Sequence, residues 1–177
     1  NILDEKEKIL RETAKEVIFP LTKEDKKLIQ NSIDQLTYSQ IEEYEKKYDL
    51  RPGMGLAFPQ LGLSKRIIII VHEYEDGKFD NYVVINPKIV SNSEEIIAAE
   101  AGEGCLSVNR DVEGHVPRFA RVTVEGYDEN GNKIRIRARE ELSIAFQHEI
   151  DHLNGILFFD RINKKKPFYS ENEIRLI

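Results

Sequence analysis

The stretch QHEIDHLNG at residues 147–155 places two histidines and a glutamate where they could serve one metal ion. On a helix, residues four apart lie one above the other, so His148 and His152 can direct both imidazoles at the same ion. Glu149 is rotated by about 100° from His148 and can reach a water molecule that the metal activates. This is the H-E-x-x-H arrangement, in which the histidines bind the metal and the glutamate acts as a base.

The rest of this segment favours a helix with two buried sides. One side is an apolar stripe made by Leu142, Phe146, Ile150 and Leu153. The histidines lie on a different side together with the small Ala145, and the Asn154-Gly155 pair is typical of a helix end. We therefore predict a helix over 141–155 with one side for packing and one for chemistry. The motif alone also arises by chance, and it does not separate proteases from other metal hydrolases.

Cys105, the only cysteine of the chain, is the best candidate for a third ligand. A catalytic metal usually has about three protein ligands and an open position for water. The residues after His152 lack the third histidine of the extended motif HExxHxxGxxH, and little helix follows to carry Glu171 or Glu173. Cys105 lies in GEGCLSV, where glycines permit close approach of the backbone and a metal would deprotonate the thiol. The alternative is a buried, inert cysteine.

Three motifs taken together resemble those of the peptide deformylase family. They are GMGLAFPQ at 53–60, EGCLS at 103–107 and QHEIDHLNG at 147–155, in the family's order and at similar separations. The resemblance spans nearly the whole chain, and RPGMGLAFPQ, INPKIVS, GEGCLSV and the insertion around 20–50 are similar to the longer, Gram-positive type. One departure is Phe58, where the family usually has alanine. We expect this change to affect packing under the loop or the mouth of the pocket.

The resemblance implies a metal-dependent hydrolase that removes the formyl group from the N-terminal formyl-methionine of newly made polypeptides, releasing formate. It implies one Fe²⁺ ion held by Cys105, His148 and His152, a site that Zn²⁺, Ni²⁺ or Co²⁺ can also occupy. Glu149 would be the base and proton carrier. The Gln60 side chain and the Leu106 N–H would stabilise the negative charge that develops on the carbonyl oxygen.

The same resemblance implies a peptide-binding site around the metal. Gly55 would let the first motif approach the substrate, whose backbone can add to it as a strand. The methionine side chain requires an apolar pocket beside the metal. The predicted substrate-binding residues are Gly53, Ile144, Ala145, Gly114, His115 and Val116. Asp151 and Arg118 are expected to pair behind the ligand helix, and His72 is expected to be structural or exposed.

The composition is that of an ordinary globular protein, with 40% hydrophobic and 33% charged residues. The net charge of −6 disfavours DNA-binding or membrane-surface roles, although a local basic patch is compatible with it. No apolar run is long enough to span a membrane, and the charged N-terminal stretch lacks the apolar core of a secretory signal. A single cysteine fits a reducing compartment, so we expect a cytoplasmic protein. We also expect it to be a monomer. The resemblance to peptide deformylases implies that its partners are formylmethionyl nascent peptides near the ribosome exit.

The order of the helices and strands that must position these groups indicates an α+β fold. We expect residues 1–177 to form a single catalytic domain. A helical segment over 20–48 begins at Thr22 and is interrupted at Tyr38-Ser39. The strongest hairpin signal is VTVEGYDENGNKIRIR, with an Asn-Gly turn. Strands are predicted at 66–74, 81–87, 88–90, 96–102, 121–128 and 133–139. We expect mostly antiparallel strands packed around the late ligand-bearing helix.

Three other functions are compatible with parts of this pattern. A zinc metallopeptidase could use the same HExxH motif without needing Cys105. A non-catalytic domain could hold a structural metal, but such sites usually have four protein ligands and no fourth is evident. A related enzyme with another substrate preference is the third, and Phe58 is the only motif feature that favours it.

Overall fold

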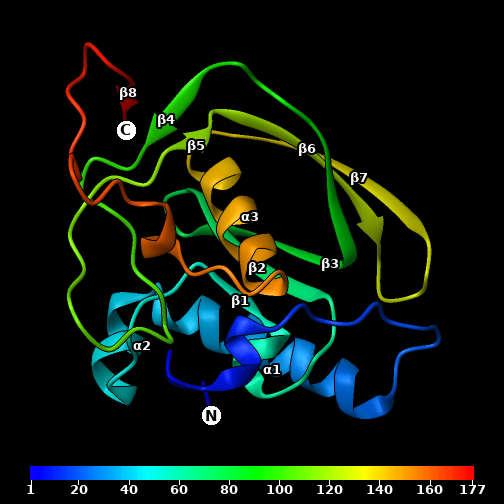
Figure 1. The fold of residues 1–177 in the computed structure, drawn as a ribbon. Helices are drawn as coiled ribbons and strands as arrows, with labels where there is room; N and C mark the ends of the chain where they lie inside the picture. The colour runs from blue at the N-terminus through cyan, green and yellow to red at the C-terminus, as the bar shows by residue number, and fades with distance from the viewer.

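A five-stranded antiparallel sheet lies between helices in the computed structural model, which describes residues 1–177 (Figure 1). In sheet order, its strands are β1 (Gly55–Ala57), β2 (Ile67–Glu75), β3 (Lys78–Asn92), β6 (Arg121–Tyr127) and β7 (Lys133–Arg139). A second sheet joins β5 (Arg118–Phe119), β4 (Ile96–Ala98) and β8 (Arg175–Leu176) in that order. All strand pairs are antiparallel except the pair of β4 and β8.

Two of the three α-helices, α1 (Lys23–Ser39) and α3 (Glu140–Leu153), pack against this framework, and α2 (Glu42–Tyr48) packs against α1. Short 3₁₀ turns occupy Lys8–Arg11, Phe58–Leu61 and Phe158–Arg161. In Figure 1, α3 lies in the middle of the molecule and α1 lies below the strands. The predicted α+β fold is confirmed, with mostly antiparallel strands around a late helix and a helix near the N-terminus.

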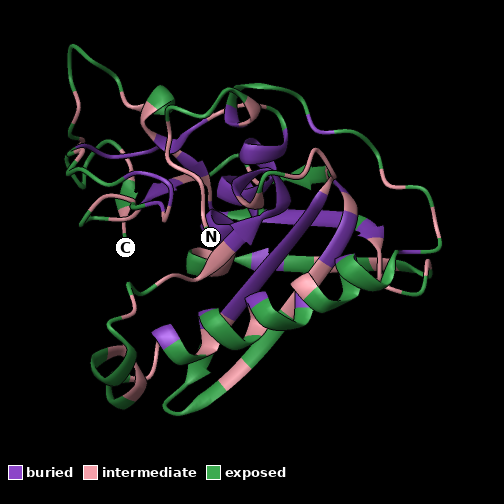
Figure 2. Cartoon of the chain, turned by 90° about the horizontal axis from the view of Figure 1, so that it is seen from below, coloured by how far each residue is buried: buried purple, intermediate pink, exposed green.

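The isoleucine run of β2 explains why helices cover both faces of the sheet. Ile68 and Ile70 point to one face and pack in a cluster with Phe146 of α3. Ile67 and Ile69 point to the other face, where their cluster includes residues of α1. Successive side chains of a strand alternate between faces, so an uninterrupted apolar run requires cover on both. Figure 2 shows these strands buried beneath α1, whose outer side is exposed.

The N-terminal helical segment divides where the sequence predicts. Helix α1 begins after Thr22, whose Oγ1 accepts a hydrogen bond from the Asp25 N–H at 3.0 Å. It ends at Ser39, so the predicted interruption is confirmed. The Asp25 carboxylate does not return to the start of the helix. It accepts from Lys65 at 2.7 Å instead and ties α1 to the segment before β2.

The predicted strands 81–87 and 88–90 are a single strand, so the prediction that Asn86-Pro87 ends a strand is wrong. The pairing of β3 with β6 shifts register between Ile85 and Lys88, and Asn86 has a φ of 53°. A local bulge thus accommodates the proline, which cannot donate a ladder hydrogen bond. The predicted strand 96–102 is shorter than expected, because β4 ends at Ala98.

The predicted hairpin of β6 and β7 is confirmed. The two strands pair from Arg121 with Arg139 to Tyr127 with Lys133. The Asp128 carboxylate stabilises the turn by accepting hydrogen bonds from the backbone N–H groups of Asn130 and Asn132. None of the helices combines the length and the apolar character that crossing a membrane requires.

Replacing Phe146 with alanine tests whether α3 is held by the core on this face of the sheet. Phe146 is fully buried and its ring contacts Tyr82 edge-on at 5.6 Å. We expect the free energy of unfolding to fall by about 3–5 kcal/mol, because a large cavity forms where the ring was. Urea denaturation of both proteins measures the change. An Ile18→Ala control, at a side chain that is 89% exposed, should change stability by less than about 0.5 kcal/mol.

Candidate metal centre

Three potential metal ligands from distant parts of the chain meet in one place. One donor atom each of Cys105, His148 and His152 lies within 4.8 Å of the others. The Cys105 Sγ is 3.2 Å from the His152 Nε2, and the two imidazole centroids are 5.3 Å apart. Helix α3 supplies both imidazoles, and the thiol comes from the loop after β4. The spacing on the helix and the position of the loop therefore create a compact set of one sulfur and two nitrogens.

Glu103 orients the first histidine. The His148 Nδ1–H donates a hydrogen bond to the Glu103 Oε1 at 2.9 Å, which leaves the Nε2 free for a metal. The Glu103 side chain is only 5% exposed. Burial by itself would raise the pKa of Glu103, but hydrogen bonds from His148 and Arg118 outweigh it and lower the pKa to about 2. Glu103 is thus held as a carboxylate against the ring.

Arg118 connects this carboxylate to the back of the ligand helix. Its guanidinium donates to Glu103 at 3.0 and 2.9 Å and to the Asp151 Oδ2 at 2.7 Å. The predicted pairing of Arg118 with Asp151 is confirmed. Arg161 also donates to Asp151, at 2.6 and 2.8 Å. Since the Arg118 side chain is 2% exposed, its contacts with Glu103 and Asp151 are buried charge-assisted hydrogen bonds, and they fix α3 relative to the Cys105 loop.

Glu149 lies directly beside the three ligands and is buried. Its Oε1 has no hydrogen-bond partner in the protein. Burial raises the pKa of Glu149 to about 7, more than the positive charge on His148 lowers it. Gly55 of β1 packs against this side chain so closely that a Cβ there would be 2.5 Å from the Glu149 Oε2. A glycine is therefore required for the first motif to lie against the carboxylate.

The donor set suits a divalent cation. A thiolate and two imidazoles are ligands for iron or zinc, and three protein ligands leave a position for water. Burial by itself would lower the pKa of His148. The charge of Glu149 and the hydrogen bonds with Cys105 and Glu103 outweigh burial, so the pKa of His148 lies well above its ordinary value. The surrounding groups thus favour positive charge at this point, which a metal ion would supply.

The two expected hydrogen-bond donors are at the same place. Gln60 is buried, with its Oε1 accepting from the Ala57 N–H at 2.9 Å and its Nε2 donating to the Ser107 Oγ at 3.0 Å. The Gln60 Nε2 is also 3.6 Å from the Cys105 Sγ. No backbone group accepts a hydrogen bond from the Leu106 N–H. One donor is therefore fixed by its neighbours, and the other is available to a ligand.

A cavity of about 470 Å³ opens next to these groups. Ile144 and Ala145 of α3, the two helix residues predicted to bind substrate, line it together with Met54. Gly53 also lines it, and a Cβ there would be 2.7 Å from the Leu106 Cδ1. The cavity is mostly bounded by the first motif, the Cys105 loop and α3, so a ligand in it would contact all three.

The structure does not bring the predicted second wall into this cavity. A Cβ at Gly114 would be 2.6 Å from Ile162, and Val116 packs in a small cluster with Cys105 and Phe158. The His115 ring contacts the C-terminal tail, where its Nδ1 accepts from the Tyr169 N–H at 2.8 Å. Gly114 instead lines a neighbouring cavity together with Glu103 and Cys105. Gly114, His115 and Val116 all lie outside the cavity that Ile144 and Ala145 line.

The structure also shows the surroundings of Phe58 and His72. Phe58 is fully buried in the cluster that joins β2 to α1, so the departure from the family motif affects packing under the loop rather than the cavity. His72 is partly exposed, and its Nε2 lies 3.8 Å from the Glu141 carboxylate.

Several residues that hold the site together were not among those predicted. Arg51 donates to the carbonyls of Cys105 and Val108, both at 2.8 Å, and so joins the first motif to the Cys105 loop. At the end of α1, the Ser39 Oγ accepts from the Gly53 N–H at 3.1 Å, and Gln40 donates to the Gly53 carbonyl at 3.1 Å. Glu103 and Arg51 could have been noticed in the sequence, because they lie inside EGCLS and RPGMGLAFPQ, whereas Ser39 and Gln40 lie in no motif.

A thiol and two imidazoles beside a buried carboxylate, on an α+β fold, are the groups that a metal-dependent hydrolase requires. Residues 1–168 match the model of the polypeptide deformylase family. The chain belongs to this family of enzymes, which remove the N-terminal formyl group from newly made polypeptides.

Sequences and structures of relatives agree with this assignment. The chain is 50% identical over 159 residues to the peptide deformylase of Oceanobacillus iheyensis. The aligned residues cover 90% of this chain and 87% of that protein. The chain is 49% identical over 170 residues to the peptide deformylase of Listeria welshimeri, covering 96% and 92%. The peptide deformylase of Thermus thermophilus is similar in structure, with a TM-score of 0.72 at 35% identity over 94% of this chain and 87% of that chain. A plant peptide deformylase has a TM-score of 0.76 at 30% identity, covering 93% and 81%.

Replacing Arg118 with methionine tests the support behind the metal ligands. The change leaves Glu103 and Asp151 as buried carboxylates without this partner, so we expect the free energy of unfolding to fall by about 3–5 kcal/mol. We also expect Zn²⁺ affinity to fall by about 10–100-fold, because His148 loses its fixed acceptor. Competition with a chelator measures the affinity. Arg161→Met serves as the control, because Asp151 keeps Arg118, and an equal loss in both variants would contradict this role.

Proposed function

We propose that Cys105, His148 and His152 hold one Fe²⁺ ion and that Glu149 is the proton carrier of the deformylation reaction. The observation that supports this most is the meeting of the Cys105 Sγ with two imidazoles from α3, beside a carboxylate oxygen that has no partner. When bound, the ion supplies Lewis-acid activation of a water molecule. Zn²⁺, Ni²⁺ or Co²⁺ would fit the same donor set.

A residue beside the ion would accept and donate the protons of the reaction. Water adds to the formyl carbon, the carbon–nitrogen bond breaks, and formate and a free amine leave. The free Oε1 of Glu149 takes a proton from the attacking water and later delivers one to the leaving amine. A pKa raised to about 7 by burial suits this carboxyl group to both steps.

Two donors would stabilise the charge that develops on the formyl oxygen. We assign this role to the Gln60 Nε2 and the Leu106 N–H, because both lie beside Cys105. Gln60 is held in place through its contacts with Ala57 and Ser107, so little reorganisation accompanies the reaction. Removing one donor of this kind typically lowers the rate by about 10²–10³-fold.

The substrate would bind in the cavity beside the ligand helix. Ile144, Ala145 and Met54 offer apolar surface for the methionine side chain. Strand β1 is at the edge of its sheet, so its outer side can pair with the peptide backbone as an added strand. Gly53 and Gly55 allow the close approach that this pairing requires, since side chains there would collide with Leu106 and Glu149.

The setting of the reaction follows from its substrate. Formylmethionyl nascent peptides are the proposed partners, so we place the enzyme in the cytoplasm, near the ribosome exit. We propose that residues 1–177 form one catalytic domain that acts as a monomer, because a single chain supplies every group assigned above.

Replacing Glu149 with glutamine tests the assigned proton carrier. The amide cannot accept the proton, so we expect deformylation of formyl-Met-Ala-Ser to fall by at least about 10²-fold while the metal remains bound. Anaerobic metal analysis and a formate assay on the same preparation measure both quantities. Glu24→Gln, at an exposed position of α1, is the matched control. Retained turnover in the Glu149 variant would show that another group carries the proton.

Replacing Ala145 with phenylalanine tests the methionine pocket. The larger side chain would fill part of the cavity, so we expect KM for formyl-Met-Ala-Ser to rise by about tenfold or more with a smaller change in kcat. A formylated peptide that begins with glycine should be less affected, because it does not need the pocket. An unchanged KM for the methionine peptide would count against the pocket assignment.

A further inference from the structure

The outer face of the β6–β7 hairpin carries a row of cations. In KIRIRAR, strand β7 places Lys133, Arg135, Arg137 and Arg139 at alternate positions and has no carboxylate. All four are exposed, whereas Ile134, Ile136 and Ala138 between them pack in or against the core. At about 3.4 Å per residue, the row is about 20 Å long.

The neighbouring strand adds to this positive charge. Arg121 of β6 lies directly opposite Arg139, a pairing of like charges that destabilises a sheet unless an anion is nearby. The ion pairs on this face are long, at 3.5 Å from Arg135 to Glu125 and 3.4 Å from Arg121 to Glu95. Lys133, Arg137 and Arg139 have no ion-pair partner. The protein therefore neutralises this face only in part, through Glu95 and Glu125.

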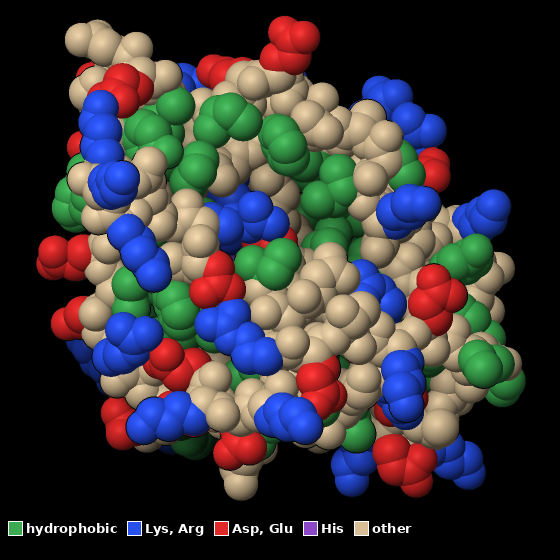
Figure 3. Space-filling view, in the orientation of Figure 1, with side chains coloured by type: hydrophobic (Ala, Val, Ile, Leu, Met, Phe, Trp, Pro, Cys, Tyr) green, Lys and Arg blue, Asp and Glu red, His purple; other side chains and the backbone are tan.

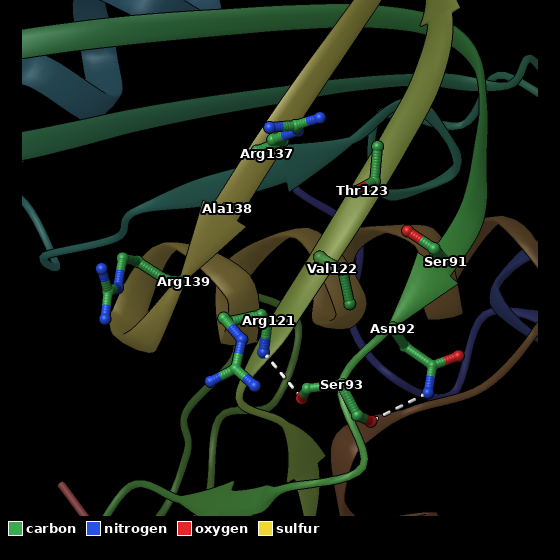
Figure 4. Close-up of a pocket in the computed structure, with 9 residues that line it drawn as sticks. All are labelled: Ser91, Asn92, Ser93, Arg121, Val122, Thr123, Arg137, Ala138 and Arg139. Atoms are coloured by element: carbon green, nitrogen blue, oxygen red, sulfur yellow. Dashed lines mark hydrogen bonds between the residues drawn. The ribbon is translucent and has the colours of Figure 1, made fainter.

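A shallow hollow of about 340 Å³ lies at the end of the row (Figure 4). Arg121, Arg137 and Arg139 line it from β6 and β7, and hydroxyl groups come from Ser91, Ser93 and Thr123. The Arg121 N–H donates to the Ser93 Oγ at 3.1 Å, which fixes the end of β3 against β6. Guanidinium and hydroxyl groups are the donors that contact phosphate oxygens in nucleic-acid complexes.

The residue types on this face indicate which kind of polyanion it can bind. Its two apolar lining residues, Val122 and Ala138, are buried in the core, and no aromatic side chain lines the hollow. The apolar or aromatic anchors that protein interfaces use, and the rings on which bases stack, are therefore missing. What remains is recognition of a phosphate backbone by charge and hydrogen bonds. Figure 3 shows Lys and Arg side chains, with Asp and Glu side chains among them, on the side of the molecule that carries β6 and β7.

We propose that the outer face of β6–β7 docks the phosphate backbone of RNA. The reason for docking rests on the proposed function, because newly made polypeptides leave a particle that is built largely of RNA. The net charge of −6 would repel RNA from the rest of the surface, so this face also sets the orientation. The hollow shares no residue with the cavity beside Cys105, so the substrate site stays open.

A different explanation of the row is protection of an edge strand. Strand β7 ends the five-stranded sheet, and charged side chains discourage edge strands from pairing with other molecules. Protection alone predicts no preference for RNA. The two explanations therefore differ in a binding measurement.

The test is fluorescence anisotropy of a labelled RNA duplex titrated with the metal-loaded full chain. The double variant Arg137→Glu/Arg139→Glu should weaken binding by at least about tenfold. The matched control Lys26→Glu/Lys27→Glu changes the net charge equally on the exposed side of α1 and should leave affinity within about twofold. For four phosphate contacts, the wild-type affinity should fall by about 10²-fold between 50 and 200 mM salt.

Several results would overturn the proposal. These are absence of RNA binding at 50 mM salt, an equal loss in both double variants, or tighter binding of a polyglutamate peptide than of RNA. The last result would favour an acidic protein segment as the partner. Both variants should keep wild-type deformylation of formyl-Met-Ala-Ser, so a failure of RNA docking is distinguishable from a failure of the proposed function.

Discussion

The site depends on one buried carboxylate, that of Glu103. It accepts a hydrogen bond from the His148 Nδ1 and two from Arg118, and Arg118 in turn holds Asp151 on the ligand helix. Glu103 is two residues before Cys105, so the same contacts that orient the imidazole also fix the loop that brings the thiol. Burying the Glu103 carboxylate without hydrogen-bond donors would cost free energy, and so would burying the Arg118 guanidinium without an acceptor. The three potential metal ligands meet because Arg118 and His148 compensate the buried charge of Glu103.

The rest of the fold delivers other groups to the same place. The two-sided burial of β2 fixes the sheet between α1 and α3, and β1 extends that sheet next to Glu149. Gly53 and Gly55 lack side chains where any Cβ would collide with Leu106 or Glu149. The insertion that forms α1 also contributes, because Ser39 and Gln40 hold the backbone of Gly53. An element far from the metal in sequence thus positions the substrate loop.

Local signals predicted much of this arrangement. The two histidines share a helix face through their spacing, and the β6–β7 hairpin follows from alternation and an Asn-Gly turn. The meeting of Cys105 with that helix required the three motifs together, since no local pattern gives a distance between segments. The bulge at Pro87 and the contacts of Arg51 and Gln40 could not be predicted, because they depend on which loops the completed fold brings together. Gly114, His115 and Val116 do not line the cavity beside Ile144 and Ala145, and the contact of His115 with the C-terminal tail is one that only tertiary structure reveals.

The most direct test of the account is X-ray absorption at the metal edge of the anaerobically purified protein. The account predicts one sulfur ligand at about 2.3 Å and two imidazole nitrogens at about 2.0–2.1 Å for the zinc-loaded form, with the remaining coordination by light atoms from solvent. A spectrum without a sulfur ligand would contradict it. So would four protein ligands that leave no position for water.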